Sequence, residues 1–237
     1  MSFLKKYTNL TAYNADLNKD FPNVSYLVDE DEMKWNKYDP DHIVAKYDVT
    51  STSEATKLLN SNSGITYQII DGVQQQSVQT TYTFDTLGEH IVKYKLNGTS
   101  IGYSQFSQCQ NLVSVTIPNS VTIIVSDAFY QCTGLTNVTI PNSVTSIGLE
   151  VFQYCSGLAS VTIPNSVTSI GRQTFFQCTG LTSITVEATT PPTLGSNAFQ
   201  STNAKLVIYV PSESVDAYKA ASGWSSLASR IQAIPTT

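Results

Sequence analysis

The four cysteines of the chain fall at a constant spacing, and this regularity constrains the fold more than any other feature. Cys109, Cys132, Cys155 and Cys178 follow one another at intervals of 23 residues in a chain of 237. A fixed period of this length is typical of repeat architectures, in which each unit buries its apolar face against its neighbours. The chain is therefore best analysed as a series of repeats.

Several apolar columns keep the same step as the cysteines. They include Leu112/Leu135/Leu158/Leu181, Val115/Val138/Val161/Ile184, Ile124/Ile147/Ile170 and Phe129/Phe152/Phe175. Within each repeat, Leu-x-x-Val-Thr-Ile alternates with a period of two and predicts a strand. The Pro-Asn-Ser that follows predicts a turn, because proline ends a strand ladder and Asn and Ser bond to the backbone in bends.

The pattern extends beyond the cysteine repeats in both directions. Ile101 and Phe106 lie one period earlier, and Phe199 lies one period later after a one-residue insertion near Thr189–Leu194. Parallel strands about 4.8 Å apart would bury the apolar columns in one continuous core. The sequence thus predicts a mainly β chain with a leucine-rich-repeat solenoid of about five 23-residue rungs over residues 97–211.

The repeat unit Cys-x-x-Leu-x-x-Val-x-Ile-Pro-x-Ser-Val-x-x-Ile-Gly-x-x-x-Phe resembles the BspA-like leucine-rich repeats of surface proteins from gut and oral anaerobes. The segments Ile208–Pro211, Ser214–Ala220 and Gly223–Trp224 resemble the C-terminal cap of that family. The resemblance covers about residues 86–237. It implies surface display and contact with host protein, matrix or glycan.

Two local features follow from the repeat register. Asn111 stands where later repeats have glycine, which predicts a backbone position with positive φ. Residues 212–237 are expected to form a cap, with a helix that starts near Ser212 or Ser214 and stops at Gly223. For Trp224 we weighed binding against a structural role, and favour the cap because an open end of the repeats invites pairing with another chain.

Residues 42–96 read as a small β-sandwich-like module. The expected strands are Ile43–Tyr47, Ile65–Ile70, Thr80–Phe84 and His90–Leu96. Subtracting one period from Val115 and Ile117 gives Val92 and Tyr94. The last strand of the module is therefore expected to serve as the first strand of the solenoid, without a flexible linker near residue 90.

Residues 1–41 are predicted to form an N-terminal arm and hairpin, with too little apolar material for an independent fold. Its candidate attachment residues are Tyr26, Met33 and Trp35. Docking on a partner and packing back onto residues 42–100 are both open. The acidic run Asp29–Glu32 lacks the spacing of a calcium loop and is interpreted as a solvated turn.

The composition disfavours several classes of partner. The chain has 13 Lys+Arg against 18 Asp+Glu, a net charge of −5, which is unsuited to nucleic acid or anionic lipid. No apolar run reaches the ~18–20 residues of a membrane span, and no signal sequence follows the first lysines. We therefore expect no nucleic acid partner, no membrane insertion and no Sec export.

The sequence gives little support to an enzyme. The two histidines, His42 and His90, lie outside the repeats without a Ser or Cys motif nearby, so a catalytic triad is not expected. The cysteines lack Cys-x-x-Cys spacing, which argues against zinc. Buried free thiols are the favoured interpretation, with disulfides between adjacent rungs left open by distance. No metal and no cofactor are predicted.

The repeats carry the candidate ligand-binding site. Its residues are Thr116, Thr139, Thr162 and Thr185 in the strands and Tyr130, Tyr154 and Phe176 in the turns before the cysteines. Polar rows beside aromatic side chains suit a glycan or a protein. The alternative is structural, since threonine favours strands and the aromatics flank the core.

Two functions are consistent with these features, and both are non-enzymatic. Phe21–Tyr26 and the acidic turn after it resemble the start of structural proteins from phages of gut anaerobes. This resemblance implies a virion component, such as a head fibre, decoration or tail-associated protein, bound to other virion proteins through residues 1–41 and to a host protein or glycan through the repeats. The alternative is an adhesin on the bacterial cell surface. Whether identical chains associate is left open.

Overall fold

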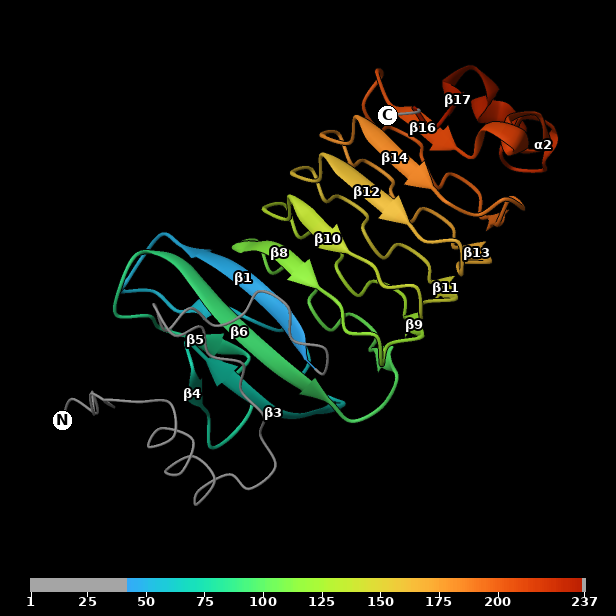
Figure 1. Cartoon of the computed structure of the whole chain (residues 1–237). Helices are drawn as coiled ribbons and strands as arrows, with labels where there is room; N and C mark the ends of the chain where they lie inside the picture. Colours follow the sequence, from blue (N-terminus) through green and yellow to red (C-terminus); the bar gives the residue numbers. More distant parts are fainter. Residues whose placement is uncertain (1–41, 236–237) are drawn as a thin grey trace. The chain divides into compact units, whose positions relative to one another are not determined.

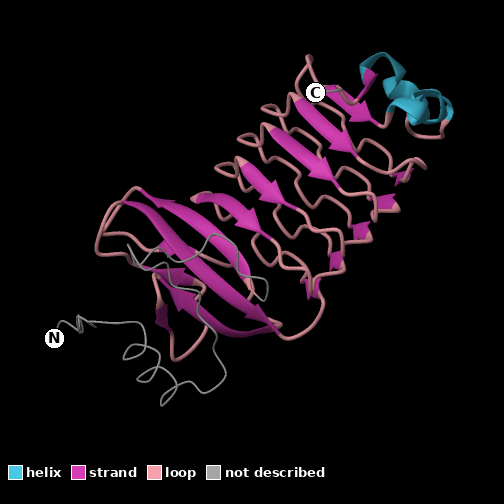
Figure 2. Ribbon diagram, in the orientation of Figure 1, coloured by secondary structure: helices cyan, strands magenta, loops and turns pink. Residues whose placement is uncertain are grey.

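The computed structural model describes residues 42–235, which are mainly β (Figures 1 and 2). The expected arm and its attachment residues Tyr26, Met33 and Trp35 lie outside the described residues, as does the acidic run Asp29–Glu32. No helix within residues 42–235 is long and apolar enough to cross a lipid bilayer.

Two columns of short parallel strands run along the repeats (Figure 1). The first column contains β8 (Leu112–Thr116), β10 (Asn137–Thr139), β12 (Ser160–Ile163), β14 (Ser183–Val186) and β16 (Val207–Val210). The second is a five-stranded sheet of β7 (Ser100–Ile101), β9 (Ile123–Ile124), β11 (Ser146–Ile147), β13 (Ser169–Ile170) and β15 (Thr193–Leu194). The first column is divided into two hydrogen-bonded sheets, because β10 ends one and β12 begins the next.

The strand register confirms the repeat period. Ser146 pairs with Ser169, one period later, whereas Ser169 pairs with Thr193, so the step there is longer by one residue. This is the insertion expected near Thr189–Leu194. Corresponding residues of successive repeats therefore lie side by side, and each apolar column of the sequence becomes a continuous row in the core.

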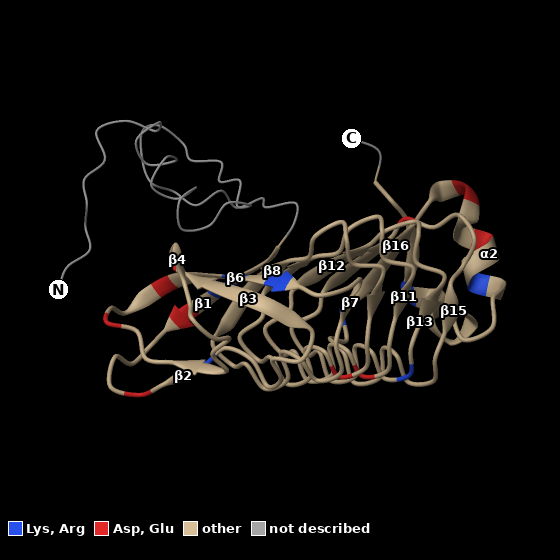
Figure 3. Ribbon diagram, turned by 90° about the horizontal axis from the view of Figure 1, so that it is seen from below, with Lys and Arg blue, Asp and Glu red and all other residues tan. Residues whose placement is uncertain are grey.

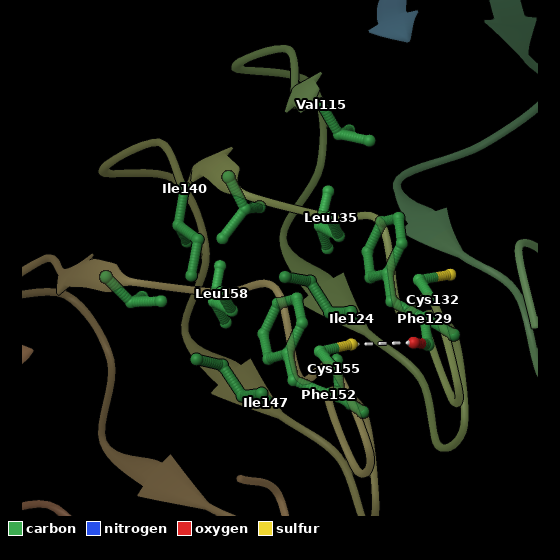
Figure 4. Packing of buried hydrophobic residues seen from close by; sticks show 14 of the residues in the cluster. Val115, Ile124, Phe129, Cys132, Leu135, Ile140, Ile147, Phe152, Cys155 and Leu158 are labelled. Carbon is green, nitrogen blue, oxygen red and sulfur yellow. Dashed lines mark hydrogen bonds between the residues drawn. The ribbon is translucent and has the colours of Figure 1, made fainter. Parts of the chain in front are cut away.

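A stack of parallel phenylalanine rings forms the centre of this core. Phe106, Phe129, Phe152, Phe175 and Phe199 follow one another with ring centroids 5.2–5.5 Å apart. Figure 4 shows two of these rings beside the leucine and isoleucine columns. Tyr94 meets the first ring edge-on at 5.4 Å, and Trp224 meets the last at 6.0 Å. Aromatic packing thus continues from the N-terminal module into the C-terminal cap.

The turns between β9 and β10, and their equivalents, contain two residues of positive φ in each repeat. They are Ser104, Gln108, Asp127, Gln131, Glu150, Tyr154, Gln173, Gln177, Asn197 and Ser201. In every turn but the last, the N–H groups of these residues donate to the next repeat: Asp127 N donates to Leu149 O at 3.0 Å, and Gln131 N to Gln153 O at 2.8 Å. These hydrogen bonds offset the cost of a conformation that residues other than glycine rarely adopt.

The prediction of positive φ at Asn111 and the glycines aligned with it is wrong. None of these glycines has positive φ; they are needed for close approach. A Cβ on Gly134 would lie 2.2 Å from the Gln110 carbonyl oxygen of the preceding repeat. Asn111 has room for a side chain because β1 (Ile43–Val49), not another repeat, lies before it, and its Nδ2 donates to Asp48 O at 2.8 Å.

The N-terminal module is an antiparallel sheet that joins the repeats directly. Its strands are β1, β6 (Gly88–Leu96), β3 (Ile65–Ile70) and β4 (Val73–Gln74), and the six-stranded order is β10-β8-β1-β6-β3-β4. A separate antiparallel pair consists of β2 (Thr56–Lys57) and β5 (Thr81–Tyr82). Tyr47 Oη donates to Leu58 O at 2.5 Å and lies 2.9 Å from Tyr94 Oη, which ties the chain after β2 to the main sheet.

The prediction that β6 supplies the first strand of the repeats is wrong. β1 lies between β6 and β8 and pairs antiparallel with both, so that Ala45 is the partner of both Val92 and Val115. Val92 is in register with Val115, as one repeat period predicts, but β1 lies between their two strands. Periodicity could not reveal β1, because β1 belongs to no repeat.

The C-terminal cap folds over the last repeat. It comprises η1 (Ser212–Ser214), α2 (Val215–Ala220), η2 (Ser225–Arg230) and β17 (Ile231–Ala233). Trp224 is fully buried and its Nε1 donates to Pro192 O at 2.7 Å, while Tyr218 Oη donates to Ala188 O at 2.7 Å. The structural interpretation of Trp224 is confirmed.

Close packing between repeats gives a matched pair of substitutions in one glycine column. A Cβ at Gly171 would lie 2.4 Å from Gly148 O, whereas at Gly102 its nearest contact is Gln105 Oε1 at 3.6 Å. Gly171→Ala should lower the free energy of unfolding by about 1–3 kcal/mol, and Gly102→Ala should change it by less than about 0.5 kcal/mol. Urea titration followed by tryptophan fluorescence measures both, and equal effects would contradict this account of the repeats.

Candidate functional site

The candidate threonines form a row on the outward face of the first strand column. Their apolar neighbours, Val115 among them, point into the core, so strand alternation places the threonines outside. Thr116 pairs with Thr139, and Thr162 pairs with Thr185. The structure therefore brings the predicted threonines into one row, in which Thr139 and Thr162 are exposed.

The hydroxyl groups of this row differ from those of five other repeat threonines. The Oγ1 atoms of Thr122, Thr136, Thr145, Thr168 and Thr182 each donate to a backbone carbonyl of the preceding repeat, at 3.1–3.2 Å. Within residues 42–235, Thr116, Thr139, Thr162 and Thr185 make no side-chain hydrogen bond. Their hydroxyls are thus available to a ligand, which the sequence alone did not show.

A second polar row lies on the same face and was missed in the sequence. It consists of Ser114, Asn137, Ser160 and Ser183, each two residues before a candidate threonine. Asn137 pairs with Ser114, and Ser160 with Ser183. The period of two in each strand was the signal that could have identified this row.

The three candidate aromatics also come together, although their sequence positions are not equivalent. Tyr130 aligns with Phe176, whereas Tyr154 lies one place later in its repeat and has φ of 63°. Its ring nevertheless lies between the other two, edge-on, with centroids 5.6 Å from Tyr130 and 5.9 Å from Phe176. Partial burial, then Tyr154 and the nearby carboxylates of Glu150 and Asp127, raise the pKa of the Tyr130 hydroxyl.

The threonine row and the aromatic row are two surfaces. The threonines come from the first strand column and the aromatics from the turns, and among the described residues no ring contact or hydrogen bond links the two rows. Charges are sparse along the repeats (Figure 3). One ion pair lies on the turn side, where Arg172 Nη2 donates to Glu150 Oε1 at 3.0 Å.

The cysteine column has a structural role. All four cysteines are free and buried, as predicted. Cys132 Sγ donates to Phe106 O at 3.0 Å, Cys155 to Phe129 O at 3.1 Å (Figure 4) and Cys178 to Phe152 O at 2.9 Å. These three thiols point at backbone carbonyls of the preceding repeat, and the Cys109 thiol lies 4.0 Å from Ser107 O in its own repeat. Cysteine suits this column because its side chain is small and apolar and its thiol can donate a hydrogen bond.

His90 is more constrained than its sequence context predicted. Its Nδ1 lies 2.5 Å from Asp71 Oδ2, and its Nε2 lies 3.0 Å from Thr86 O. The ring packs on Phe84, with centroids 4.1 Å apart. These contacts tie the turn between β3 and β4 to the turn that precedes β6. Within residues 42–235, no group of three His, Cys, Asp or Glu side chains could hold a metal ion.

The fold and repeat register place the chain in the class of leucine-rich-repeat proteins. The family model described as "BspA type Leucine rich repeat region" matches residues 77–219 in six copies, one more than the five rungs expected. The chain belongs to this BspA-type family. A comparison with curated proteins gives no match.

Three solved structures are similar to the chain over part of its length. A leucine-rich-repeat protein of T. pallidum (TpLRR) has 22% identity, a TM-score of 0.39, and coverage of 54% of this chain and 65% of its own. A leucine-rich-repeat protein from Bacteroides ovatus has 25% identity, a TM-score of 0.39, and coverage of 58% and 40%. A leucine-rich cell surface protein from Faecalibacterium prausnitzii has 23% identity and a TM-score of 0.29, and the match covers 65% of this chain and 54% of that protein. The match spans less than two thirds of each of these proteins.

Burial of the cysteines predicts their reactivity. Burial raises the pKa of Cys132 and of Cys178 to about 12, and that of Cys109 and Cys155 well above its ordinary value. At pH 8, dithiobis(nitrobenzoate) should therefore modify the folded protein at least about a hundredfold more slowly than the protein in urea.

The same pKa shifts determine whether the free energy of unfolding rises or falls with pH. Because the pKa values are raised in the folded state, thiol ionisation favours unfolding as the pH rises above about 8.5. Rapid modification of the folded chain at pH 8 would contradict burial of the column.

Proposed function

We propose that the chain is a recognition module whose repeats form a solenoid and whose threonine row, together with the serine and asparagine row beside it, binds host glycoprotein. The observation that carries the proposal is the contrast between two kinds of threonine. The hydroxyls of Thr145, Thr168 and Thr182 bond to the preceding repeat, whereas those of Thr116, Thr139, Thr162 and Thr185 make no hydrogen bond within residues 42–235.

The geometry suits a ligand with many polar groups. Corresponding residues of successive repeats present the same donors and acceptors at the strand spacing of about 4.8 Å. Hydroxyl side chains both donate and accept, so they can bond to sugar hydroxyls and to peptide groups. Single contacts of this type are weak, and an array provides affinity through their number. The aromatic row of Tyr130, Tyr154 and Phe176 offers a second, separate contact surface.

Two double variants test the threonine row. Thr139→Arg with Thr162→Arg places two long side chains on the proposed face, and Thr145→Arg with Thr168→Arg places the same change on exposed threonines immediately before β11 and β13. Binding to immobilised gastric mucin should fall at least about tenfold in the first variant and change less than about twofold in the second. Thermal unfolding checks that both remain folded.

Mucin with and without its glycans separates the two components of the ligand. Loss of binding after deglycosylation assigns the contact to sugar, and its retention assigns the contact to polypeptide. Equal effects of the two double variants, or no binding of the parent chain to either form of mucin, would overturn the proposal.

For the site of display we propose a virion surface, with a bacterial cell surface as the alternative. The support is the resemblance of Phe21–Tyr26 to the start of phage structural proteins. In a phage-producing culture, quantitative proteomics should find the chain in gradient-purified particles at a fixed ratio to the major capsid protein. If the chain is instead enriched in washed cell envelopes and absent from the particles, display on a virion is overturned and the cell-surface adhesin is favoured.

A further inference from the structure

The last repeat ends in a row of backbone donors that have no acceptor. In the repeat before it, three alternate turn residues donate to the last one: Gln173 N to Ser196 O at 3.0 Å, Phe175 N to Ala198 O at 2.9 Å and Gln177 N to Gln200 O at 3.1 Å. The equivalent donors of the last turn are the N–H groups of Asn197, Phe199 and Ser201. Within residues 42–235 these three groups have no hydrogen-bond partner.

The three donors belong to residues that line a cavity between the last turn and the cap. The cavity has a volume of about 490 Å³ and is lined by Asn197, Phe199 and Ser201 on one side and by Leu227 and Arg230 of η2 on the other. The cap covers the core of the last repeat through Trp224, but it does not supply carbonyl oxygens to these donors. This volume lies within the range of about 300–1,000 Å³ typical of ligand sites.

The charge and backbone conformation of the cavity favour an anion. Arg230 is the one charged residue in the lining, which contains no carboxylate. Its Nη1 donates to Thr202 Oγ1 at 3.2 Å, and within residues 42–235 it forms no ion pair. Asn197 and Ser201 have φ of 60° and 58°, and turns with left-handed residues can present backbone N–H groups to an anion.

We propose that this cavity binds a sugar acid, with the carboxylate at Arg230 and ring or hydroxyl oxygens at the N–H groups of Asn197, Phe199 and Ser201. The guanidinium favours a carboxylate because it donates two parallel hydrogen bonds. The three N–H groups can bond to a row of oxygen atoms, because the equivalent N–H groups of Gln173, Phe175 and Gln177 bond to carbonyl oxygens of the next repeat. Ser196 and Ser226 add hydroxyls to the lining. This site lies at the cap and is independent of the threonine row.

Amide NMR tests the assignment directly on the full chain. Titration with glucuronate should shift the amide signals of Asn197, Phe199 and Ser201 in a saturable manner. The amides of Gln173, Phe175 and Gln177 are internal controls, because the next repeat already occupies them. Glucose should leave all six signals in place, since it lacks the carboxylate. No shift with glucuronate, or an equal shift with glucose, would overturn the proposal.

Two arginine variants and a second anion complete the test. Arg230→Gln should weaken glucuronate binding at least about tenfold, because it removes a charge-assisted pair. Arg172→Gln removes an arginine outside the cavity and should have no effect. Arg230→Lys should restore part of the affinity, which a merely structural role of Arg230 in the cap would not require. Shifts with sulfate but not with glucuronate would replace the sugar acid by a small inorganic anion and overturn the assignment.

Discussion

Hydrogen bonds between the turns of successive repeats are the constraint on which the rest of the structure depends. Donation from Asp127 N to Leu149 O, and its equivalents, holds neighbouring repeats close together, and these donors have a left-handed backbone although they are not glycine. The same closeness excludes a Cβ at Gly134 and Gly171. It also brings Cys132, Cys155 and Cys178 within reach of a carbonyl of the preceding repeat, to which a thiol can donate without adding volume. Glycine and cysteine columns thus have one origin.

The parts of the fold that repeat could be predicted from the sequence, and the parts that do not repeat could not. The apolar columns, the insertion near Thr189–Leu194 and the buried Trp224 followed from register and from amphipathic spacing. The position of β1 did not, because its pairing with β8 joins distant segments that share no pattern. The left-handed positions were also missed, since Glu150 and Tyr154 carry no sequence signal for such a backbone.

The sequence could predict on which face of the repeats the candidate threonines lie, but not which of the threonine hydroxyls are free. Strand alternation was sufficient to place Thr139 outside the core. Alternation could not distinguish Thr139 from Thr145. Whether a threonine hydroxyl bonds to a neighbouring repeat depends on how close its Oγ1 atom lies to a backbone carbonyl oxygen of that repeat. Nor could spacing predict that Tyr154, out of register by one residue, would still meet Tyr130 and Phe176. The left-handed backbone at Tyr154 is part of the geometry that brings the rings together.

The two ends of the repeat array are closed by different chemistry, an antiparallel β1 at one end and an aromatic, helical cap at the other. Neither closure depends on how many repeats lie between them, since each contacts only the repeat next to it. A lineage can therefore gain or lose whole 23-residue units by internal duplication or deletion without redesigning either end. The reach of the binding face then becomes a quantity that evolution can adjust in fixed steps, and protein engineers can do the same.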